Sequence, residues 1–176
     1  MATGDHHHEL TEKGPNTQKL EQLLADHKII GLDTSIFIYH FEAHPRYYPL
    51  TKIILASVER GRWQGIISPI TLMEVTVRPW QLEQDNIARQ YEVLLVNFPN
   101  LHMALVDRHI ARQAAKLRAR HRLRPADAII AATAMSRNAT MFVTNDRQFA
   151  RLAPLMEIIQ LDDLSSNEPT EYPSTP

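Results

Sequence analysis

The chain is predicted to fold as an α/β sandwich around a parallel sheet, and two features of its 176 residues predict this class. Short, almost wholly apolar segments recur along the chain, which is typical of strands that are covered on both faces. Segments with apolar residues at helical spacing separate them, as in βαβ units. Because the crossovers of such units are right-handed, the C-terminal ends of the strands should share one edge of the sheet, where open α/β sheets bind ligands.

Four or five segments are expected to be strands, namely 28–32, 63–67, 101–105, 140–144 and, as the fifth, 157–161. The expected helices cover 17–27, 50–61, 69–79, 81–96, 107–121 and a run of small residues that opens at Arg124. Ser68 and Pro69 are a typical N-cap and first-turn residue, and Pro79 is expected to end the helix that they begin. Asp33 comes where the first strand ends and a helix begins.

A single domain is expected over residues 17–164, because domains run to about 100–200 residues. The polar termini, 1–16 and 165–176, are expected to be flexible tails. The three histidines His6–His8 lie in the first tail. They are excluded from the candidate site, because so polar a segment would not hold a metal ligand rigidly.

The composition, 44% hydrophobic and 22% charged, is ordinary for a globular protein with a sizeable core. A formal net charge of −1 means that no global positive field indicates a nucleic-acid binder, so the distribution of charge matters instead. The absence of cysteine excludes disulfides, thiolate zinc sites and cysteine nucleophiles. No apolar run approaches the roughly 20 residues of a membrane span, and no secretory signal is visible. A cytoplasmic protein without a membrane segment is therefore expected.

Four acidic residues are expected at the C-terminal edge of the sheet. Asp33 directly follows the first strand, and Asp146 follows the fourth. Asp127 lies in the first turn of a helix, and Glu74 lies in the helix after the second strand. The topology, rather than their spacing, brings these distant residues toward one another.

Each acid also has a purely structural interpretation. Asp127 could complement the helix dipole, and Asp33 could cap a helix. Asp146 could be a turn residue, and Glu74 could lie on the solvated face of its helix. Together, however, carboxylates about 4 Å apart repel by roughly 4 kcal/mol per pair, so a cluster persists only if it is protonated or holds a cation. Oxygen ligands favour Mg²⁺ or Mn²⁺, and such an ion can activate water for attack on a phosphodiester.

The segments around these acids resemble the four motifs of the PIN-domain family. They are Ile-Ile-Gly-Leu-Asp33-Thr-Ser35, Ser-Pro-Ile-Thr-Leu-Met-Glu74, Arg-Pro-Ala-Asp127-Ala-Ile-Ile-Ala-Ala-Thr-Ala134 and Phe-Val-Thr144-Asn-Asp146-Arg-Gln-Phe149. Their order and spacing agree with the family, and the likeness spans residues 28–161. The third motif is specific in this register, whereas the first alone would carry little weight.

The resemblance implies a PIN-like three-layer α/β/α sandwich with a short, mostly parallel sheet of four or five strands. It also implies endoribonuclease activity with one or two Mg²⁺ or Mn²⁺ ions and metal-activated water as the nucleophile. The family's acidic pocket corresponds to Asp33, Glu74, Asp127 and Asp146. The first and third of these match metal ligands, and the other two complete the pocket directly or through water. Ser35 and Thr144 match hydroxyl residues that orient the acids by hydrogen bonds.

Many single-domain members of this size are VapC-type toxins, each neutralised by a small antitoxin whose C-terminal segment covers the site. The resemblance therefore implies an RNA substrate and allows a VapB-like antitoxin and a homodimer as partners. The chain departs from a minimal toxin in its extension of about two dozen residues before the first strand and in its long polar C-terminus. A stand-alone PIN nuclease with another biological role is the alternative.

Basic residues are concentrated before the third motif, at Arg108, Arg112, Lys116, Arg118, Arg120, Arg122 and Arg124. Arg112, Lys116 and Arg120 are four residues apart and should share one helix face. This face is either simply solvated or, together with Arg147, a surface that brings RNA to the acidic pocket.

Two histidines and four aromatic residues lie together after the first motif. His40 and His44 are four residues apart, but Pro45 follows directly and no third ligand is near, so a metal role is not expected. The aromatic residues are Tyr39, Phe41, Tyr47 and Tyr48. They are expected to form a packing or partner surface, in a region that often contributes to dimers in the resembled family.

Two other classes of function have less support in the sequence. A catalytically silent PIN-type module that binds RNA or protein is possible in principle, but the presence of all four acids argues against it. An aspartate-based phosphotransferase typically has Asp-x-Asp after its first strand, where this chain has Asp33-Thr-Ser35. A Walker phosphate loop is excluded, because the chain has five glycines and no GxxxxGK.

Overall fold

The computed structural model describes residues 15–23 and 25–165. The tails expected at 1–16 and 165–176, and the His6–His8 run, lie outside the described residues apart from Pro15, Asn16 and Ser165. These three residues belong to helices. The expected domain bounds of 17–164 stay a prediction.

Five parallel strands form one sheet in the order β3-β2-β1-β4-β5. The strands are β1 (Ile29–Leu32), β2 (Gln64–Ile67), β3 (Leu101–Met103), β4 (Met141–Thr144) and β5 (Glu157–Gln160). The parallel sheet predicted from the apolar runs is therefore confirmed, with the fifth strand present. β1 lies at its centre between β2 and β4, so the segments that follow these three strands are neighbours at the C-terminal edge.

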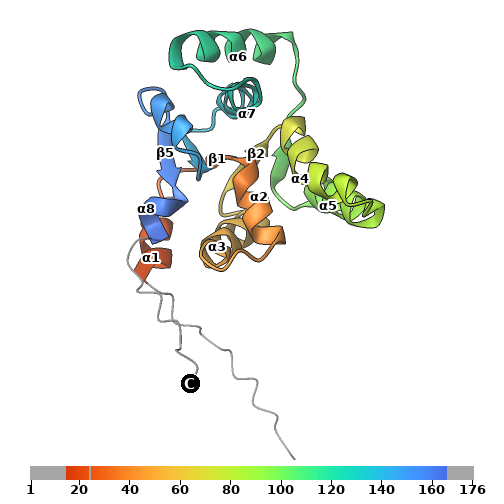
Figure 1. Cartoon of the computed structure of the whole chain (residues 1–176). Coiled ribbons are helices and arrows are strands. Elements are labelled where there is room, and N and C mark those ends of the chain that lie inside the picture. The colour runs from red at the N-terminus through yellow and green to blue at the C-terminus, as the bar shows by residue number, and fades with distance from the viewer. Residues whose placement is uncertain (1–14, 24, 166–176) are drawn as a thin grey trace, which may run out of the picture.

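Helices cover both faces of the sheet, which makes the three-layer α/β/α sandwich (Figure 1). The α-helices are α1 (Pro15–Leu23), α2 (Thr34–Phe41), α3 (Tyr48–Glu59), α4 (Pro69–Gln81), α5 (Asp85–Asn97), α6 (Arg108–His121), α7 (Pro125–Ser136) and α8 (Leu161–Ser165). Two hydrophobic cores reflect the alternation along the strands. Ile30 and Leu32 pack with α2 and α3 on one face, whereas Phe142 packs with α6 and α7 on the other.

Several expected boundaries were wrong, each for a local reason. The first helix ends at Leu23 rather than near His27. The ring of His27 instead forms a hydrogen bond of 2.8 Å with the hydroxyl of Thr140, directly before β4. Pro79 does not end α4, which continues to Gln81. Its missing N–H costs one hydrogen bond, which is tolerable because the helix stops two residues later. A 3₁₀ helix, η1 (Arg147–Leu152), and the short α8 were not predicted.

No helix in the described part of the chain is long and apolar enough to cross a membrane.

Gly31, at the centre of β1, allows α7 to pack closely on the sheet. A Cβ atom at this position would lie 2.4 Å from Cδ2 of Phe142 and 2.6 Å from Cβ of Ala134. Neither neighbour can move easily, because Phe142 is fully buried and Ala134 belongs to the small-residue face of α7. The glycine in the first motif therefore serves the packing of the helix that carries Asp127.

Replacing Gly31 by alanine should destabilise the fold by about 1–3 kcal/mol, the usual cost of overpacking a core. The measurement is the free energy of unfolding in urea. Gly65→Ala in β2 is the matched control, because its new Cβ would meet mainly the flexible ends of Leu101 and Leu32. If Gly31→Ala lowered the free energy of unfolding less than Gly65→Ala did, this explanation of the packing would be contradicted.

Candidate active site

The four predicted acids lie around the C-terminal edge of the sheet. Asp33 is the N-cap of α2 directly after β1, and Asp146 is the N-cap of η1 after the neighbouring strand β4. Asp127 lies in the first turn of α7. Glu74 lies in α4, which follows β2. The strand order thus places their segments side by side, as the topology predicted.

Asp33 is a buried carboxylate held by two hydroxyls. Its side chain is 6% exposed, and its Oδ2 accepts hydrogen bonds from Ser35 Oγ and Thr144 Oγ1, each at 2.7 Å. Burial raises the pKa of Asp33 to about 6, although both hydroxyls act in the opposite direction. The carboxylate makes no side-chain cap bond to α2, so the simple capping interpretation of Asp33 is wrong.

Asp127 presents an unsatisfied oxygen. Its Oδ2 is buried and has no hydrogen-bond partner among the described residues, which is rare in folded proteins. Burial raises the pKa of Asp127, the charges of Asp146 and Glu74 raise it further, and the charge of Arg124 opposes them. An uncompensated buried acceptor of this kind is costly unless a proton or a cation satisfies it.

Glu74 and Asp146 each accept a hydrogen bond from a neighbouring residue. Thr34 Oγ1 donates a short hydrogen bond to Glu74 Oε2. Glu74 is half-buried and therefore does not lie fully on the solvated face of α4. Asp146 Oδ1 accepts from the backbone N–H of Gln148 at 2.8 Å, so this residue does have the structural role that its turn-like sequence indicated. Its own N–H donates to Thr144 Oγ1 at 2.9 Å. The hydroxyl of Thr144 therefore connects Asp33 with the backbone of Asp146.

Electrostatic interactions link all four acids in a chain. The charge of Glu74 acts on both Asp33 and Asp127, and the charge of Asp146 acts on Asp127. Nevertheless, within residues 15–23 and 25–165 no group of three or more His, Asp or Glu side chains is placed so that it could hold one metal ion. The donor set and the orphaned oxygen of Asp127 fit a hard divalent cation. The assignment of these acids as ligands stays a prediction.

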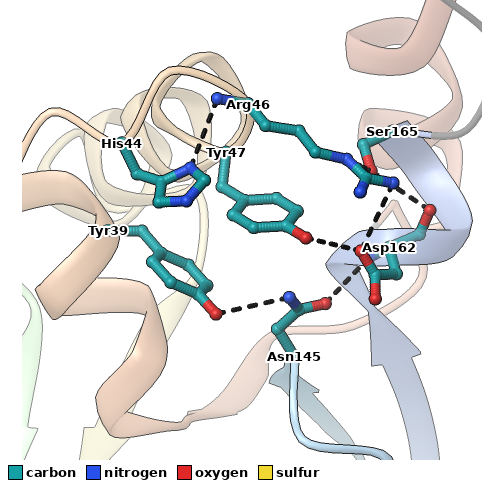
Figure 2. Close-up of polar contacts among 7 residues, drawn as sticks. All are labelled: Tyr39, His44, Arg46, Tyr47, Asn145, Asp162 and Ser165. Atoms are coloured by element: carbon teal, nitrogen blue, oxygen red, sulfur yellow. Dashed lines mark hydrogen bonds and ion pairs between the residues drawn. The ribbon is translucent and has the colours of Figure 1, made fainter.

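A polar network that the sequence did not reveal supports this edge of the sheet (Figure 2). Its centre is Asn145, between Thr144 and Asp146. The N–H of Asn145 donates to Ser35 Oγ at 3.3 Å, and its Nδ2 donates to the hydroxyl of Tyr39 at 3.4 Å. Its Oδ1 accepts from the N–H of Asp162 at 2.9 Å. Asn145 thus connects the hydroxyl that holds Asp33 with the start of α8.

The outer part of this network fastens α8 to the segment before α3. Tyr47 donates from its hydroxyl to Asp162 Oδ1 at 2.5 Å, and Arg46 Nη2 lies 3.4 Å from the same oxygen. Arg46 Nε donates to Ser165 Oγ at 2.8 Å (Figure 2). No periodic pattern could have signalled these contacts, because their partners are more than a hundred residues apart in the sequence.

The histidines and aromatic residues after the first motif form stacked pairs. The ring of His40 stacks on Tyr48, and the ring of His44 stacks on Tyr47. Tyr39 also stacks on Tyr47. Phe41 completes the set by stacking on Tyr91 of α5. Among the described residues no histidine takes part in a metal-binding group, and these aromatic residues serve packing; their role in a dimer stays a prediction.

The predicted RNA-binding residues are exposed. Arg112, Lys116 and Arg120 lie on one face of α6, as their spacing predicted, and Arg147 begins η1 beside Asp146. Their contact with RNA stays a prediction. Arg124, which sequence reasoning treated only as part of a basic run, acts on the pKa of Asp127 and therefore belongs to the surroundings of the site.

The fold and the acidic edge define a class: a parallel α/β sandwich with carboxylates at the C-terminal ends of its central strands. A family model described as the PIN domain matches residues 30–155. Because this stretch is well over half of the chain, the protein belongs to the PIN domain family, whose members are nucleases. The resemblance found in the four motifs is thereby confirmed. Among curated proteins, none matches the chain.

Several solved structures share the fold. A toxin–antitoxin complex from Klebsiella pneumoniae aligns with a TM-score of 0.55 and 24% identity over 76% of this chain and 97% of that one. VapBC2 from Rickettsia felis, bound to a DNA fragment from its promoter, aligns at 0.57 and 20% identity over 75% and 98%. DNA-bound VapBC from Salmonella typhimurium aligns at 0.54 and 26% identity over 76% and 98%.

Asp33→Asn should stabilise the metal-free protein at neutral pH. Folding raises the pKa of Asp33 from 3.8 to about 6. The protonated carboxyl therefore favours the folded state fully below pH 3.8, and this stabilisation is lost as the pH rises through 6 and the buried group ionises. A neutral amide avoids this loss, which amounts to at most about 3 kcal/mol. The expected gain, measured by thermal or urea unfolding in EDTA, is therefore large near neutrality and small near the pH where both states are protonated.

The exposed acid Asp163 in α8 supplies the matched control, Asp163→Asn. It should change stability little at either pH. If Asp33→Asn gave the same change in stability across the whole pH range, burial of an ionised Asp33 would not be the cost that the structure indicates.

Proposed function

We propose that the protein is an endoribonuclease that depends on Mg²⁺ or Mn²⁺ and hydrolyses RNA phosphodiesters with a water molecule as nucleophile. The observation that carries this proposal is the buried, unpartnered Oδ2 of Asp127 within a chain of mutually repelling carboxylates. A divalent cation would give that oxygen a ligand bond and would also offset the repulsion among the carboxylates. The membership in a family of nucleases supports the reaction class.

Each residue of the site would have a distinct role in binding the cation. Asp33 and Asp127 would bind the cation directly, since both carry raised pKa values that a cation would lower. Glu74 and Asp146 would complete the pocket directly or through water. Ser35 and Thr144 keep the Asp33 carboxylate oriented through its Oδ2. When bound, the ion would lower the pKa of a water and neutralise charge on the phosphate.

We further propose that the protein acts as the toxin of a toxin–antitoxin pair in the cytoplasm. The similar structures from Klebsiella pneumoniae, Rickettsia felis and Salmonella typhimurium are described as toxin–antitoxin or VapBC complexes, which supports an antitoxin as partner. The chain has a surface suited to a protein partner. Met73, Val77 and Trp80 follow one face of α4 and are 52%, 43% and 49% exposed. Exposed apolar rows of this kind mark interaction sites. The same surface could also bind a second copy of the chain in a homodimer.

The direct test of the activity is cleavage of single-stranded RNA by the purified protein. We expect cleavage with Mg²⁺ or Mn²⁺ and none with EDTA. Asp127→Asn should reduce the rate by more than the roughly 10–100-fold that removal of a supporting hydrogen bond typically costs at a metal site. The same variant should not lower the melting temperature, because the neutral amide relieves repulsion in the empty pocket.

Asp163→Asn, a matched change of an exposed acid outside the site, should cleave like the unchanged protein. Robust cleavage by Asp127→Asn would refute the mechanism. Binding of RNA without cleavage under any divalent ion would instead identify a silent RNA-binding module.

A further inference from the structure

One side of α6 carries four cations in a row that winds gradually around the helix. Arg108, Arg112, Lys116 and Arg120 follow one another at intervals of four residues, and all four are exposed. With a rise of about 1.5 Å per residue, the row extends over about 18 Å. It is the outer surface of a helix that packs against α7 on the far side of the sheet from α3 (Figure 1).

No acidic residue lies within this row, and the one acid next to it, Asp107, caps the helix. The helix, Arg108–His121, contains neither Asp nor Glu, and in the part of the chain that the structure describes none of the four cations forms an ion pair. Three successive like-charge pairs at i, i+4 each cost the helix about 0.2–0.5 kcal/mol. A face that is merely solvated usually mixes both signs of charge, so this one is better explained by an anionic partner.

The other face of α6 holds the row in place. Ile110, Ala114 and Leu117 are buried against the second core, and Asp107 Oδ1 caps the helix by accepting from the N–H of Ile110 at 2.8 Å. A helix fixed in this way presents its cations at a regular spacing of about 6 Å. A polyanion with evenly repeated charges could bind along it without reordering the protein.

The row leads to the acidic pocket. Arg151 of η1 donates to the carbonyls of His121 and Arg122 at 3.3 Å and 3.0 Å, which fastens the C-terminal end of α6 to the 3₁₀ helix that Asp146 caps. Arg124, an exposed cation, then follows α6 as the N-cap of α7, three residues before Asp127. Positive charge therefore continues from the outer end of α6 to the edge of the site.

We propose that this face of α6, defined as Arg108, Arg112, Lys116 and Arg120, binds the phosphate backbone of the RNA at a distance from the cleaved bond. The inference rests on the proposed function and adds a property of its substrate. The substrate must be long enough to occupy the pocket and the α6 face together. A short oligonucleotide can occupy only one of the two at a time and is therefore bound more weakly.

A nucleic acid fits this face better than an acidic protein segment does. Protein interfaces are centred on buried aromatic or large apolar anchors. Between the cations of α6 the exposed residues Ala111, Ala115 and Ala119 offer none, and no large exposed apolar side chain lies in this helix. The contrast with the apolar row on α4 is clear. Phosphate contacts need only accessible cations at regular intervals.

The test measures binding of fluorescent single-stranded RNA in EDTA, so that cleavage cannot interfere, over a range of salt concentrations. Oligoribonucleotides of about 4 and about 16 nucleotides span the site sizes of common single-strand binders. The variant carries Arg108→Gln, Arg112→Gln, Lys116→Gln and Arg120→Gln together. The matched control removes the same number of exposed cations elsewhere, by Lys28→Gln, Lys52→Gln, Arg60→Gln and Arg89→Gln. Unfolding curves establish that both variants are folded.

We expect the α6 variant to bind the long RNA more weakly and to show a slope of log K against log salt that is shallower by about 3, at roughly 0.7 for each phosphate that is no longer neutralised. The loss should be smaller for the short RNA, which makes fewer phosphate contacts, and the control variant should keep most of the affinity for the long RNA. Equal losses of affinity in both variants, or no loss in the α6 variant, would overturn the proposal.

Cleavage of the same RNAs with Mg²⁺ separates this proposal from the proposed function. Long RNA that is bound through α6 but never cleaved would support the surface and contradict the nuclease. Equal cleavage of long and short RNA by the unchanged protein and by the α6 variant would support the nuclease and contradict the surface. A variant that loses only the binding of an acidic protein partner would assign the face to protein and overturn the proposal.

Discussion

Holding one buried and three half-buried carboxylates close enough to repel one another is the constraint on which the rest of the site depends. The fold places four acids at the C-terminal edge of one sheet, and two of them have pKa values raised by burial. Such an arrangement costs stability, so the surrounding structure must hold the acids in place. Thr144 and Ser35 do so for Asp33, and the close packing of α7 over Gly31 does so for Asp127. Strongly perturbed carboxyl groups of this kind cluster at functional sites.

The support extends beyond the acids themselves. Asn145 connects the hydroxyl of Ser35 with Asp162, and Tyr47 and Arg46 fasten Asp162 from the other side. The C-terminal helix α8 is thus tied to the same edge of the sheet as the acids, although it contributes no predicted ligand. On the opposite side, Arg151 ties α6 to η1. The four acids therefore lie between two supports: the hydrogen bonds that hold α8 on one side, and the basic helix α6 on the other.

The sheet could be predicted from sequence because its central strands are mainly buried on both faces and therefore form continuous apolar runs, as in Ile29–Leu32. Asp33 could be placed because it follows such a run directly, and Asp146 because it comes two residues after another. The continuation of α4 through Pro79 and the 3₁₀ helix could not be predicted, since both are decided by local hydrogen bonds rather than by periodicity. Asn145 was missed for a related reason: its importance comes from partners more than fifteen residues or more than a hundred residues away, which leave no local signal.

The central claim is that a divalent cation occupies the space between these carboxylates. The most direct measurement is a crystal of the protein soaked with Mn²⁺, in which anomalous scattering locates the ion. The account predicts a peak within about 2–2.6 Å of carboxylate oxygens of Asp33 and Asp127, with the side chains drawn closer together than they are without the ion. A well-ordered site that holds no peak, or a peak only at surface histidines, would contradict it.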